Sequence, residues 1–500
     1  MKDRLLALAA CAAFIVLATA NAGGYRFGVS DQAFYIPAVL QHLDASAFPR
    51  DRTLIDGQAH LLVFDELLAW LSRVSGISLE WLFFWTYALT ASTLAMAYWR
   101  LSRAFKGRMW TSVAFLAAMT LRHRVTATGV NTFEGYFHPR MLAFALGLLA
   151  AGCTLRQRPI GTSTLLACAI LVHPTTALWF ATWLGAAWLL LATRDNLLRI
   201  RVLVVSVAFA GALIAAWLWL YGERMDPEWS ALLASKDYVF PLSQWPWRVW
   251  SLHGLTLALL FGIFHWRRQH GMTTAFETSC CVGLGVLVGA FVLSLAFNEH
   301  RVALAVQLQT SRVLWLVEIV ATWYLVWAIC GEPAGVRRPT RAAAVALTLA
   351  VASFARGAYI IGVERGGQPL VQTALPRNEW TDALQWMRAN TPLSAHVLAD
   401  PGHAWKYGTS VRVGAQRDVF FEEVKDVAMA LYSRDAAARA LTRIRALPAL
   451  ESSDRQSLES LTTRFRLDYV VGERILMLTS EPIWHNERFA VWSLRSEALR

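Results

Sequence analysis

Residues 274–297 read TAFETSCCVGLGVLVGAFVLSLAF, with Glu277 as the one charged side chain. A helix of about 20 apolar residues is long enough to cross the hydrocarbon core of a bilayer. Ten further apolar stretches are spread along the chain, so the sequence predicts a mainly α, polytopic bundle of about 11 transmembrane helices. The predicted spans are Leu5–Ala22, Leu79–Trp99, Met109–Leu121, Met141–Leu155, Ile160–Val172, Thr175–Ala192, Val202–Tyr221, Ser251–Trp266, Thr274–Phe297, Val313–Cys330 and Ala342–Ile361.

The composition supports a membrane protein and argues against a nucleic-acid-binding protein. Hydrophobic residues make up 56% of the chain and charged residues 16%, whereas soluble domains carry about 25% charged residues. The net charge is +12, but Lys and Arg gather in short loops beside apolar spans, as the positive-inside rule predicts. The sequence therefore predicts contacts with membrane lipids and no nucleic-acid partner.

The distribution of Lys and Arg also predicts the orientation in the membrane. The short loops on one side hold more basic residues than the longer loops on the other side, and such an excess marks cytoplasmic loops. We therefore expect a cytoplasmic N-terminus and an extracytoplasmic C-terminal region, in a bacterial inner membrane. The basic inner segments are Lys2/Arg4, Arg100 to Arg108, Arg156/Arg158, Arg194 to Arg201, Arg267/Arg268 and Arg337 to Arg341.

Polar sequence is concentrated on the predicted outer side. We expect a transmembrane domain at 1–363, which includes an outer loop at 23–78, and a soluble extracytoplasmic α/β domain at 364–500. At about 130 residues, the second domain is long enough to form its own core. Its expected helices are Arg377–Ala389, Glu422–Ala446 and Ser453–Phe465, and its expected strands are His396–Asp400, Leu467–Gly472 and Phe489–Leu494.

The first outer loop is predicted to contain two helices. Ser30 is placed to cap a helix from Asp31 to about Leu43, and a second amphipathic pattern runs from His60 to Val74. Pro49 and Gly57 interrupt the stretch between them. Amphipathic helices of this kind lie at the membrane interface, which would hold Asp31 just above the membrane. The other acids of the loop are interpreted as solvated; they are Asp56, Asp65 and Glu66.

This arrangement resembles the type-C membrane glycosyltransferase fold (GT-C). The stretches that carry the resemblance are Tyr25–Gln32 (YRFGVSDQ), Asn131–Arg140 (NTFEGYFHPR) and Val172–Pro174 (VHP), which look like elements of a bacterial subgroup of this fold. The family has an acidic residue early in the first outer loop, two interfacial helices, many further spans and often an outer C-terminal domain. It often carries paired acids in its outer loops, whereas Asp31 is followed by Gln32.

The resemblance implies transfer of a sugar from a polyprenyl-phosphate donor to an extracytoplasmic acceptor. Asp31 would take the proton of the acceptor hydroxyl as this attacks the anomeric carbon. Arginines at the outer interface would hold the donor phosphate, because the planar guanidinium matches phosphate oxygens. The arginines expected in this role are Arg122, Arg124, Arg140 and Arg312.

Three further residues are auxiliary candidates. Glu134 and His138 lie near Arg140 and could assist acid–base chemistry, and His173 precedes Pro174 at a turn between two spans. Glu134 and His138 could also bind a divalent metal, but two residues spaced four apart are too few to predict a metal site. No cofactor is predicted.

The same residues have plainer interpretations. Arginines at helix ends extend to lipid headgroups, and an acid in the first turn of a helix is stabilised by the helix dipole. A noncatalytic envelope protein of the same fold is therefore an alternative to the enzyme, and the lone Asp31 would fit it. A transporter is a weaker alternative, because transporters place polar residues at the midplane and often show repeated halves.

Overall fold

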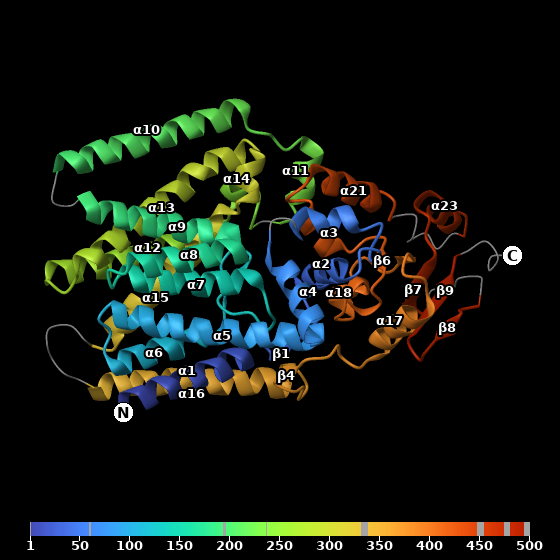
Figure 1. Cartoon of the computed structure of the whole chain (residues 1–500), viewed down its shortest axis with the longest axis horizontal. Coiled ribbons are helices and arrows are strands. Elements are labelled where there is room, and N and C mark those ends of the chain that lie inside the picture. Colours follow the sequence, from blue (N-terminus) through green and yellow to red (C-terminus); the bar gives the residue numbers. More distant parts are fainter. Residues whose placement is uncertain are drawn as a thin grey trace.

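The computed structural model describes residues 2–59, 62–193, 197–236, 238–331, 339–447, 455–474 and 481–494. Within these residues the protein is mainly helical, with a small sheet in its C-terminal part. Figure 1 shows two regions along the long axis of the molecule: a bundle of long helices, and a mixed region that contains the C-terminal part together with the helices of the first outer loop.

A helix lies at every apolar stretch that was predicted to span the membrane. Six described segments are long and apolar enough to cross a bilayer, which fits a multi-pass membrane protein. The count of eleven spans stays a prediction, because several of the helices are shorter. The helices are α1 (Lys2–Asn21), α5 (Leu79–Ala104), α6 (Met109–Met119), α7 (Pro139–Thr154), α8 (Pro159–Val172), α9 (Pro174–Thr193), α10 (Leu197–Tyr221), α12 (Trp247–Gln269), α13 (Ala275–Glu299), α15 (Val313–Ile329) and α16 (Pro339–Tyr359).

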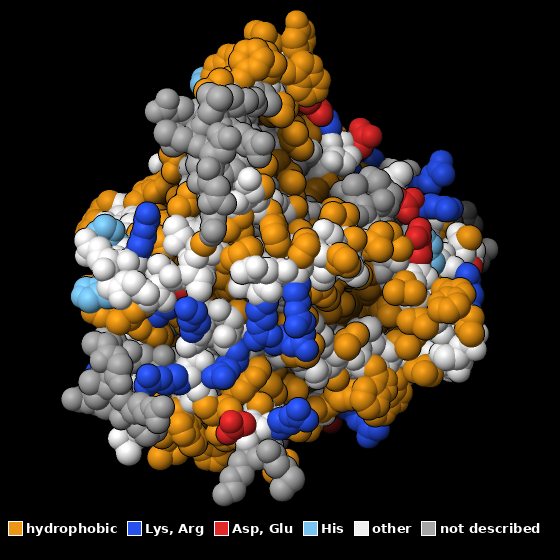
Figure 2. Space-filling model, turned by 60° about the vertical axis from the view of Figure 1, so that its left-hand side comes forward, with side chains coloured by type: hydrophobic (Ala, Val, Ile, Leu, Met, Phe, Trp, Pro, Cys, Tyr) orange, Lys and Arg blue, Asp and Glu red, His pale blue; other side chains and the backbone are white. Residues whose placement is uncertain are grey.

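Basic side chains gather at the end of the bundle that lies opposite the C-terminal part (Figure 2). Two of the predicted inner segments meet there, because Arg156 donates a hydrogen bond to the carbonyl of Arg100 (3.4 Å). Burial, followed by the charges of Arg100 and Arg158, lowers the pKa of Arg156. Such clustering is typical of a cytoplasmic end. Residues 194–196 and 332–338, where other basic residues were predicted to face the cytoplasm, fall outside the described residues.

The first outer loop differs from the prediction at two places. Helix α2 (Gln32–Leu43) has Asp31 as its N-cap, whereas Ser30 adopts a left-handed conformation with a φ of 53° and does not cap the helix. An additional helix, α3 (Arg52–Ala59), precedes α4 (Phe64–Ser75). Gly57 lies inside α3, because the packing of Leu54 against Met429 and Ala436 outweighs the weak helix propensity of a glycine. Residues 60–61 of the predicted second helix fall outside the described residues.

The C-terminal part is a small α/β unit. Its sheet has the strand order β6-β5-β7-β9-β8, in which β5 is parallel to β6 and β7 while β9 is antiparallel to β7 and β8. Helix α17 (Glu379–Asn390) packs on the sheet through Trp380, Leu384 and Met387. The strands are β5 (His396–Leu398), β6 (Asp418–Val419), β7 (Tyr469–Glu473), β8 (Trp484–His485) and β9 (Phe489–Ser493).

The single helix predicted at Glu422–Ala446 is two helices. They are α20 (Glu423–Met429) and α21 (Arg434–Ile444), and the hydroxyl of Ser433 caps the second by accepting from the amide of Ala436. Ser favours this N-cap position because its side chain competes with the backbone of a continuous helix. A further helix, α23 (Arg455–Phe465), follows, and residues 453–454 of its predicted range fall outside the described residues.

Three segments far apart in the chain meet where the bundle joins the C-terminal part. Strand β1 (Tyr25–Arg26) of the first outer loop pairs in parallel with β4 (Val371–Gln372). Helix α11 (Pro227–Leu233), from the connection between α10 and α12, shares a hydrophobic core with the C-terminal part, and its Trp229 donates an indole hydrogen bond to the carbonyl of Ala430 (2.6 Å). This junction holds the candidate site described below.

Asp65 of α4 was predicted to be solvated, but its carboxylate is buried. Helix α4 turns Leu67, Trp70 and Val74 outward, as expected for a helix whose apolar face lies on a membrane surface. Asp65 therefore faces inward, where it is 1% exposed and 3.5 Å from the imidazole of His42. Burial raises the pKa of Asp65 to about 6.

The Asp65→Asn variant is expected to be more stable than the wild type at pH 7 and equally stable at pH 4. The pKa of Asp65 is about 6 in the folded protein and about 3.9 in the unfolded chain, so stability is lost as the pH rises between these values. The substitution removes this loss, about 1–3 kcal/mol. Thermal unfolding at the two pH values measures the effect, with Asp56→Asn as the exposed control; a destabilised Asp65→Asn protein at pH 7 would contradict the expectation.

Candidate functional site: a cationic pocket at the junction

A pocket of about 100 Å³ lies at the junction of the membrane helices and the C-terminal part. Apolar residues of the C-terminal segment 427–432 form one wall. The opposite lining brings together five residues that the sequence singled out, and adds a lysine that it did not. These charged or titratable residues are Asp31, His138, Arg140, His173, Arg312 and Lys236.

The carboxylate of Asp31 is bound on both oxygens. Its Oδ2 accepts from the hydroxyl of Tyr136 (3.2 Å) and faces Nε2 of His138 at 3.2 Å, while its Oδ1 accepts from the ammonium of Lys425 (2.7 Å). Burial by itself would raise the pKa of Asp31, but Lys425, His138 and Arg140 outweigh burial and hold it well below its usual range. Asp31 is therefore ionised at neutral pH, and 35% of its side chain is exposed.

The turn before Asp31 is fixed by Gln32. The side-chain oxygen of Gln32 accepts from the amide of Gly28 (2.7 Å), and its amide group donates to the carbonyl of Phe137 (3.3 Å). Gly28 has a φ of +78°, and a Cβ there would lie 2.5 Å from Leu375, so only glycine fits. Gln32, which stands where the resemblance would favour a second acid, is thus a buried residue that ties the Asp31 turn to the segment before α7.

Two histidines cap the membrane helices α7 and α9 in the same way. Each precedes a proline at the first helical position, and its Nδ1 accepts a backbone hydrogen bond: His138 from Arg140 (3.1 Å) and His173 from Thr176 (3.2 Å). The ring proton of His138 must then lie on Nε2, which faces Asp31. Burial and the charge of Arg140 lower the pKa of His138 to about 4, so this imidazole is neutral at pH 7.

The pocket holds more positive than negative charge. Arg140 contacts Glu134 at 3.5 Å, but in the part of the chain that the structure describes neither Arg312 nor Lys236 forms an ion pair or a side-chain hydrogen bond. Burial and nearby Lys425 lower the pKa of Lys236. The N-terminal ends of α7 and α9 add the positive ends of their dipoles. This arrangement suits an anion with several oxygens, such as a phosphate.

The structure does not bring the other predicted residues to the pocket. Arg122 donates to the carbonyl of Phe133 (2.8 Å) and lies 3.9 Å from Glu134, and Arg124 is exposed on β2 (Arg124–Val125). Glu134 is buried and contacts both Arg122 and Arg140, so it is placed to orient these two side chains. Burial raises the pKa of Glu134. Among the described residues, no group of three or more His, Cys, Asp or Glu could hold a metal ion.

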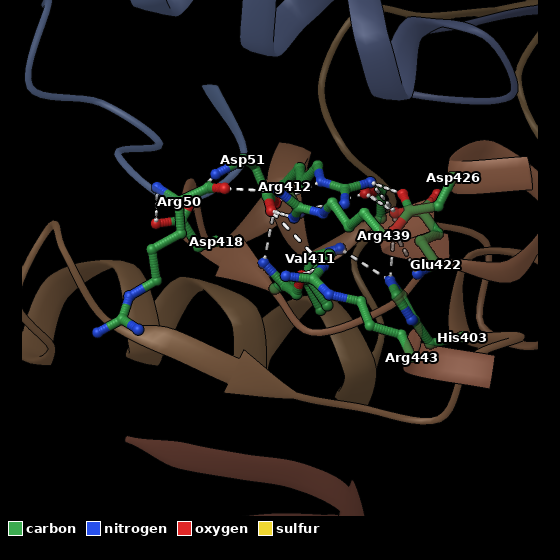
Figure 3. A network of polar contacts seen from close by, with 12 residues as sticks. Arg50, Asp51, His403, Val411, Arg412, Asp418, Glu422, Asp426, Arg439 and Arg443 are labelled. Carbon is green, nitrogen blue, oxygen red and sulfur yellow. Dashed lines mark hydrogen bonds and ion pairs between the residues drawn. The ribbon is translucent and has the colours of Figure 1, made fainter. Parts of the chain in front are cut away.

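A buried ionic network, which no local sequence pattern predicted, joins the first outer loop to the C-terminal part (Figure 3). Asp51 of the first outer loop accepts from Nε of Arg412 (2.7 Å), from the amide of Val419 (3.1 Å) and from Arg439. Arg412 in turn lies 2.7 Å from Oδ1 of Asp426 in α20. The network ties the first outer loop to the helix that carries Lys425.

Comparisons with known proteins do not identify a family. No protein-family model matches the chain, and no curated protein matches it. Among solved structures, the chain is similar to the archaeal oligosaccharyltransferase AglB from Archaeoglobus fulgidus, determined in complex with an inhibitory peptide and a dolichol-phosphate. The sequence identity is 12% and the TM-score 0.48, over 95% of this chain and 69% of that chain.

Proposed function

We propose that the protein is a GT-C-type membrane glycosyltransferase that transfers a sugar from a polyprenyl-phosphate donor to an extracytoplasmic acceptor. It would lie in a bacterial inner membrane with its N-terminus in the cytoplasm and residues 364–500 outside as a separate domain. The observation that carries the proposal is the convergence of one carboxylate, Asp31, with the cations Arg140, Arg312 and Lys236 in a single pocket.

The proposed reaction needs a base and a stabilised leaving group. The oxygen of the acceptor hydroxyl attacks the anomeric carbon, and the bond from that carbon to the phosphate oxygen breaks with its electron pair on the phosphate. Asp31 accepts the hydroxyl proton, while Arg140 and Arg312 stabilise the charge that develops on the leaving phosphate. Neutral His138 holds the carboxylate through its Nε2 proton.

The site suits a donor that is embedded in a membrane. The pocket is lined from the first residues of α7 and from His173 and Arg312, which cap α9 and α15. The ends of membrane helices lie at the level of lipid headgroups, which is where the phosphate of a polyprenyl lipid resides. The amphipathic helix α4 beside this region supports the same depth for Asp31.

A noncatalytic lipid-phosphate-binding protein is the second candidate. One observation favours it: both oxygens of Asp31 have partners already, and Lys425 forms an ion pair with one of them. In this alternative Asp31 would only position Lys425, and the same cations would bind a phosphate without any transfer.

Analysis of envelope glycans and lipid-linked sugars tests the proposal. A deletion strain is expected to lose a sugar from an extracytoplasmic glycan and to accumulate the lipid-linked donor. The wild-type gene and the Asp56→Asn control should restore the profile, whereas Asp31→Asn, inserted in the membrane in equal amount, should not. Restoration by Asp31→Asn would overturn the catalytic role and favour the noncatalytic protein.

A further inference from the structure

A lysine from the C-terminal part occupies the carboxylate that would act as the base. The ammonium of Lys425 lies 2.7 Å from Oδ1 of Asp31, the side chain of Lys425 is 8% exposed, and its ammonium lies 5.6 Å from the centroid of the Phe34 ring. Asp31 is the sole acidic partner of Lys425 among the described residues. Since Tyr136 and His138 occupy the other oxygen, Oδ1 is the oxygen left to act as the base, and the ammonium of Lys425 takes one of its lone pairs and lowers its basicity while Lys425 stays in place.

The backbone that carries Lys425 is held by the buried ionic network, whereas its side chain is held by the single ion pair with Asp31 among the described residues. The next residue, Asp426, lies 2.7 Å from Nη1 of Arg412, and Arg412 is held by Asp51 (Figure 3). Helix α20 therefore has one defined position relative to the first outer loop. The long, flexible stem of a lysine allows its ammonium to turn to another partner without any movement of the helix.

A phosphate bound in the pocket would be a second partner for the ammonium of Lys425. Lys236 lines the pocket, forms no ion pair with a described residue, and lies close enough to Lys425 to feel its charge. Of these two neighbouring lysines, only Lys425 has an ion-pair partner among the described residues. A phosphate bound by Lys236, Arg140 and Arg312 would compete with Asp31 for the ammonium of Lys425, because the donor phosphodiester brings a second full negative charge into the pocket and gains a further one as the sugar leaves.

We propose that Lys425 is a counter-ion that the substrate displaces: it neutralises Asp31 in the empty site, turns to the donor phosphate when this binds, and leaves Oδ1 of Asp31 free for the acceptor hydroxyl. This inference rests on the proposed function and adds to it the order in which donor and acceptor are used. The donor must bind before the acceptor can be deprotonated, so Lys425 is a positioning residue that acts through Asp31.

A double-mutant cycle on binding tests this inference without the need for turnover. The full-length protein is placed in phosphatidylglycerol nanodiscs with increasing amounts of undecaprenyl phosphate, and the dissociation constant is measured for the wild type, Asp31→Asn, Lys425→Met and the double variant. Asp31→Asn should bind about 3- to 10-fold more tightly than the wild type, because Lys425 is already released, and Lys425→Met should bind more weakly. In the Lys425→Met background, Asp31→Asn should not tighten the binding of undecaprenyl phosphate.

A merely structural lysine would not produce this pattern. If Asp31→Asn tightens binding equally in both backgrounds, the gain comes from the removal of a repelling charge and the role of Lys425 is overturned. If the wild type does not bind undecaprenyl phosphate, the lipid that leaves in the proposed reaction, both the lipid-phosphate assignment and this inference fail. If it binds and only the expected cycle is absent, this inference alone fails, so the two failures are distinguishable. Lys425→Gln, which keeps a polar tip, replaces Lys425→Met if the latter does not fold.

The same domain provides a matched control pair. Lys406 forms an ion pair with Asp400, but 58% of the Lys406 side chain is exposed and neither residue lines the pocket. The substitutions Lys406→Met and Asp400→Asn, alone and together, should leave the dissociation constant of undecaprenyl phosphate unchanged. A change of the same size as in the Asp31–Lys425 cycle would mean that the response is a general effect of charge, which would overturn the inference.

Discussion

Asp31→Asn is expected to lower the rate constant of sugar transfer by about 10²–10⁴-fold, the usual contribution of a positioned general base. The amide has nearly the shape of the carboxylate, so the turn held by Gln32 and the hydrogen bond from Tyr136 should survive. Donor binding is therefore not weakened, and the release of Lys425 should even tighten it, so the loss should fall on kcat rather than on KM. Purified protein in nanodiscs, with the donor and acceptor found in the deletion strain, provides the measurement.

The pH dependence of the transfer rate tests whether Asp31 is the base. Lys425, His138 and Arg140 hold the pKa of Asp31 well below its usual range, so the base stays ionised, and the wild-type rate should not fall on its account until the pH is below the usual range of an aspartate. A decline that begins near pH 6 would identify another base. The Asp56→Asn protein, altered at an exposed acid of the same loop, should keep the wild-type kcat, and an unchanged kcat for Asp31→Asn would refute the catalytic role.

Arg412→Met is expected to destabilise the C-terminal part by about 3–5 kcal/mol, because it leaves buried carboxylates without their cation. Arg412 is fully buried and contacts Asp51, Glu422 and Asp426. Thermal unfolding and limited proteolysis of the variant measure the loss. The matched control is Arg488→Met, because Arg488 forms an exposed ion pair with Glu473, and such pairs contribute at most about 1 kcal/mol.

The network also predicts how acid affects stability. Burial would raise the pKa of Asp51, but Arg412, Arg439 and Arg443 outweigh it and lower the pKa. The stabilisation is therefore complete above the unfolded pKa of about 3.9 and is lost as the pH falls further. If Arg412→Met does not fold, Asp51→Asn removes the contact from the other side. Stability of Arg412→Met equal to that of Arg488→Met would show that the network does not hold the two regions together.

Local sequence patterns predicted where the long helices lie, but not every residue at which a helix begins or ends. Hydropathy located every long helix of the bundle, since a run of apolar residues has no alternative to a helix in lipid. Ser30 was expected as a cap because serine favours that position before a helix, yet it adopts a positive φ and Asp31 is the N-cap residue. The break between α20 and α21 could have been inferred from Ser433, which is a good N-cap residue.

Only some residues of the candidate site could be predicted from the sequence. Arg140 and Arg312 could be proposed because polar residues stand out at the ends of apolar spans, and Asp31 could be proposed from the resemblance of the first outer loop. The roles of Lys425 and Lys236 could not be proposed, and neither could the Asp51–Arg412 pair. The sequence around a lysine or arginine in a polar segment does not show which distant residue it contacts. Asp31 and Lys425 are 394 positions apart, and no periodicity relates residues at that separation. Arg122 and Arg124 were placed at the donor because spacing alone does not show that Glu134 engages Arg122.

The same separation has a consequence for biosynthesis. In the proposed topology Asp31 would cross the membrane long before α20 is translated, so the nascent chain would carry this carboxylate without its lysine partner through most of its insertion. The pocket lining from residues 427–432 and the parallel pairing of β1 with β4 can form only after the C-terminal part has been synthesised. A polypeptide released by a ribosome that stalls upstream of position 425 would therefore have its membrane helices in place but lack Lys425 and part of the pocket lining.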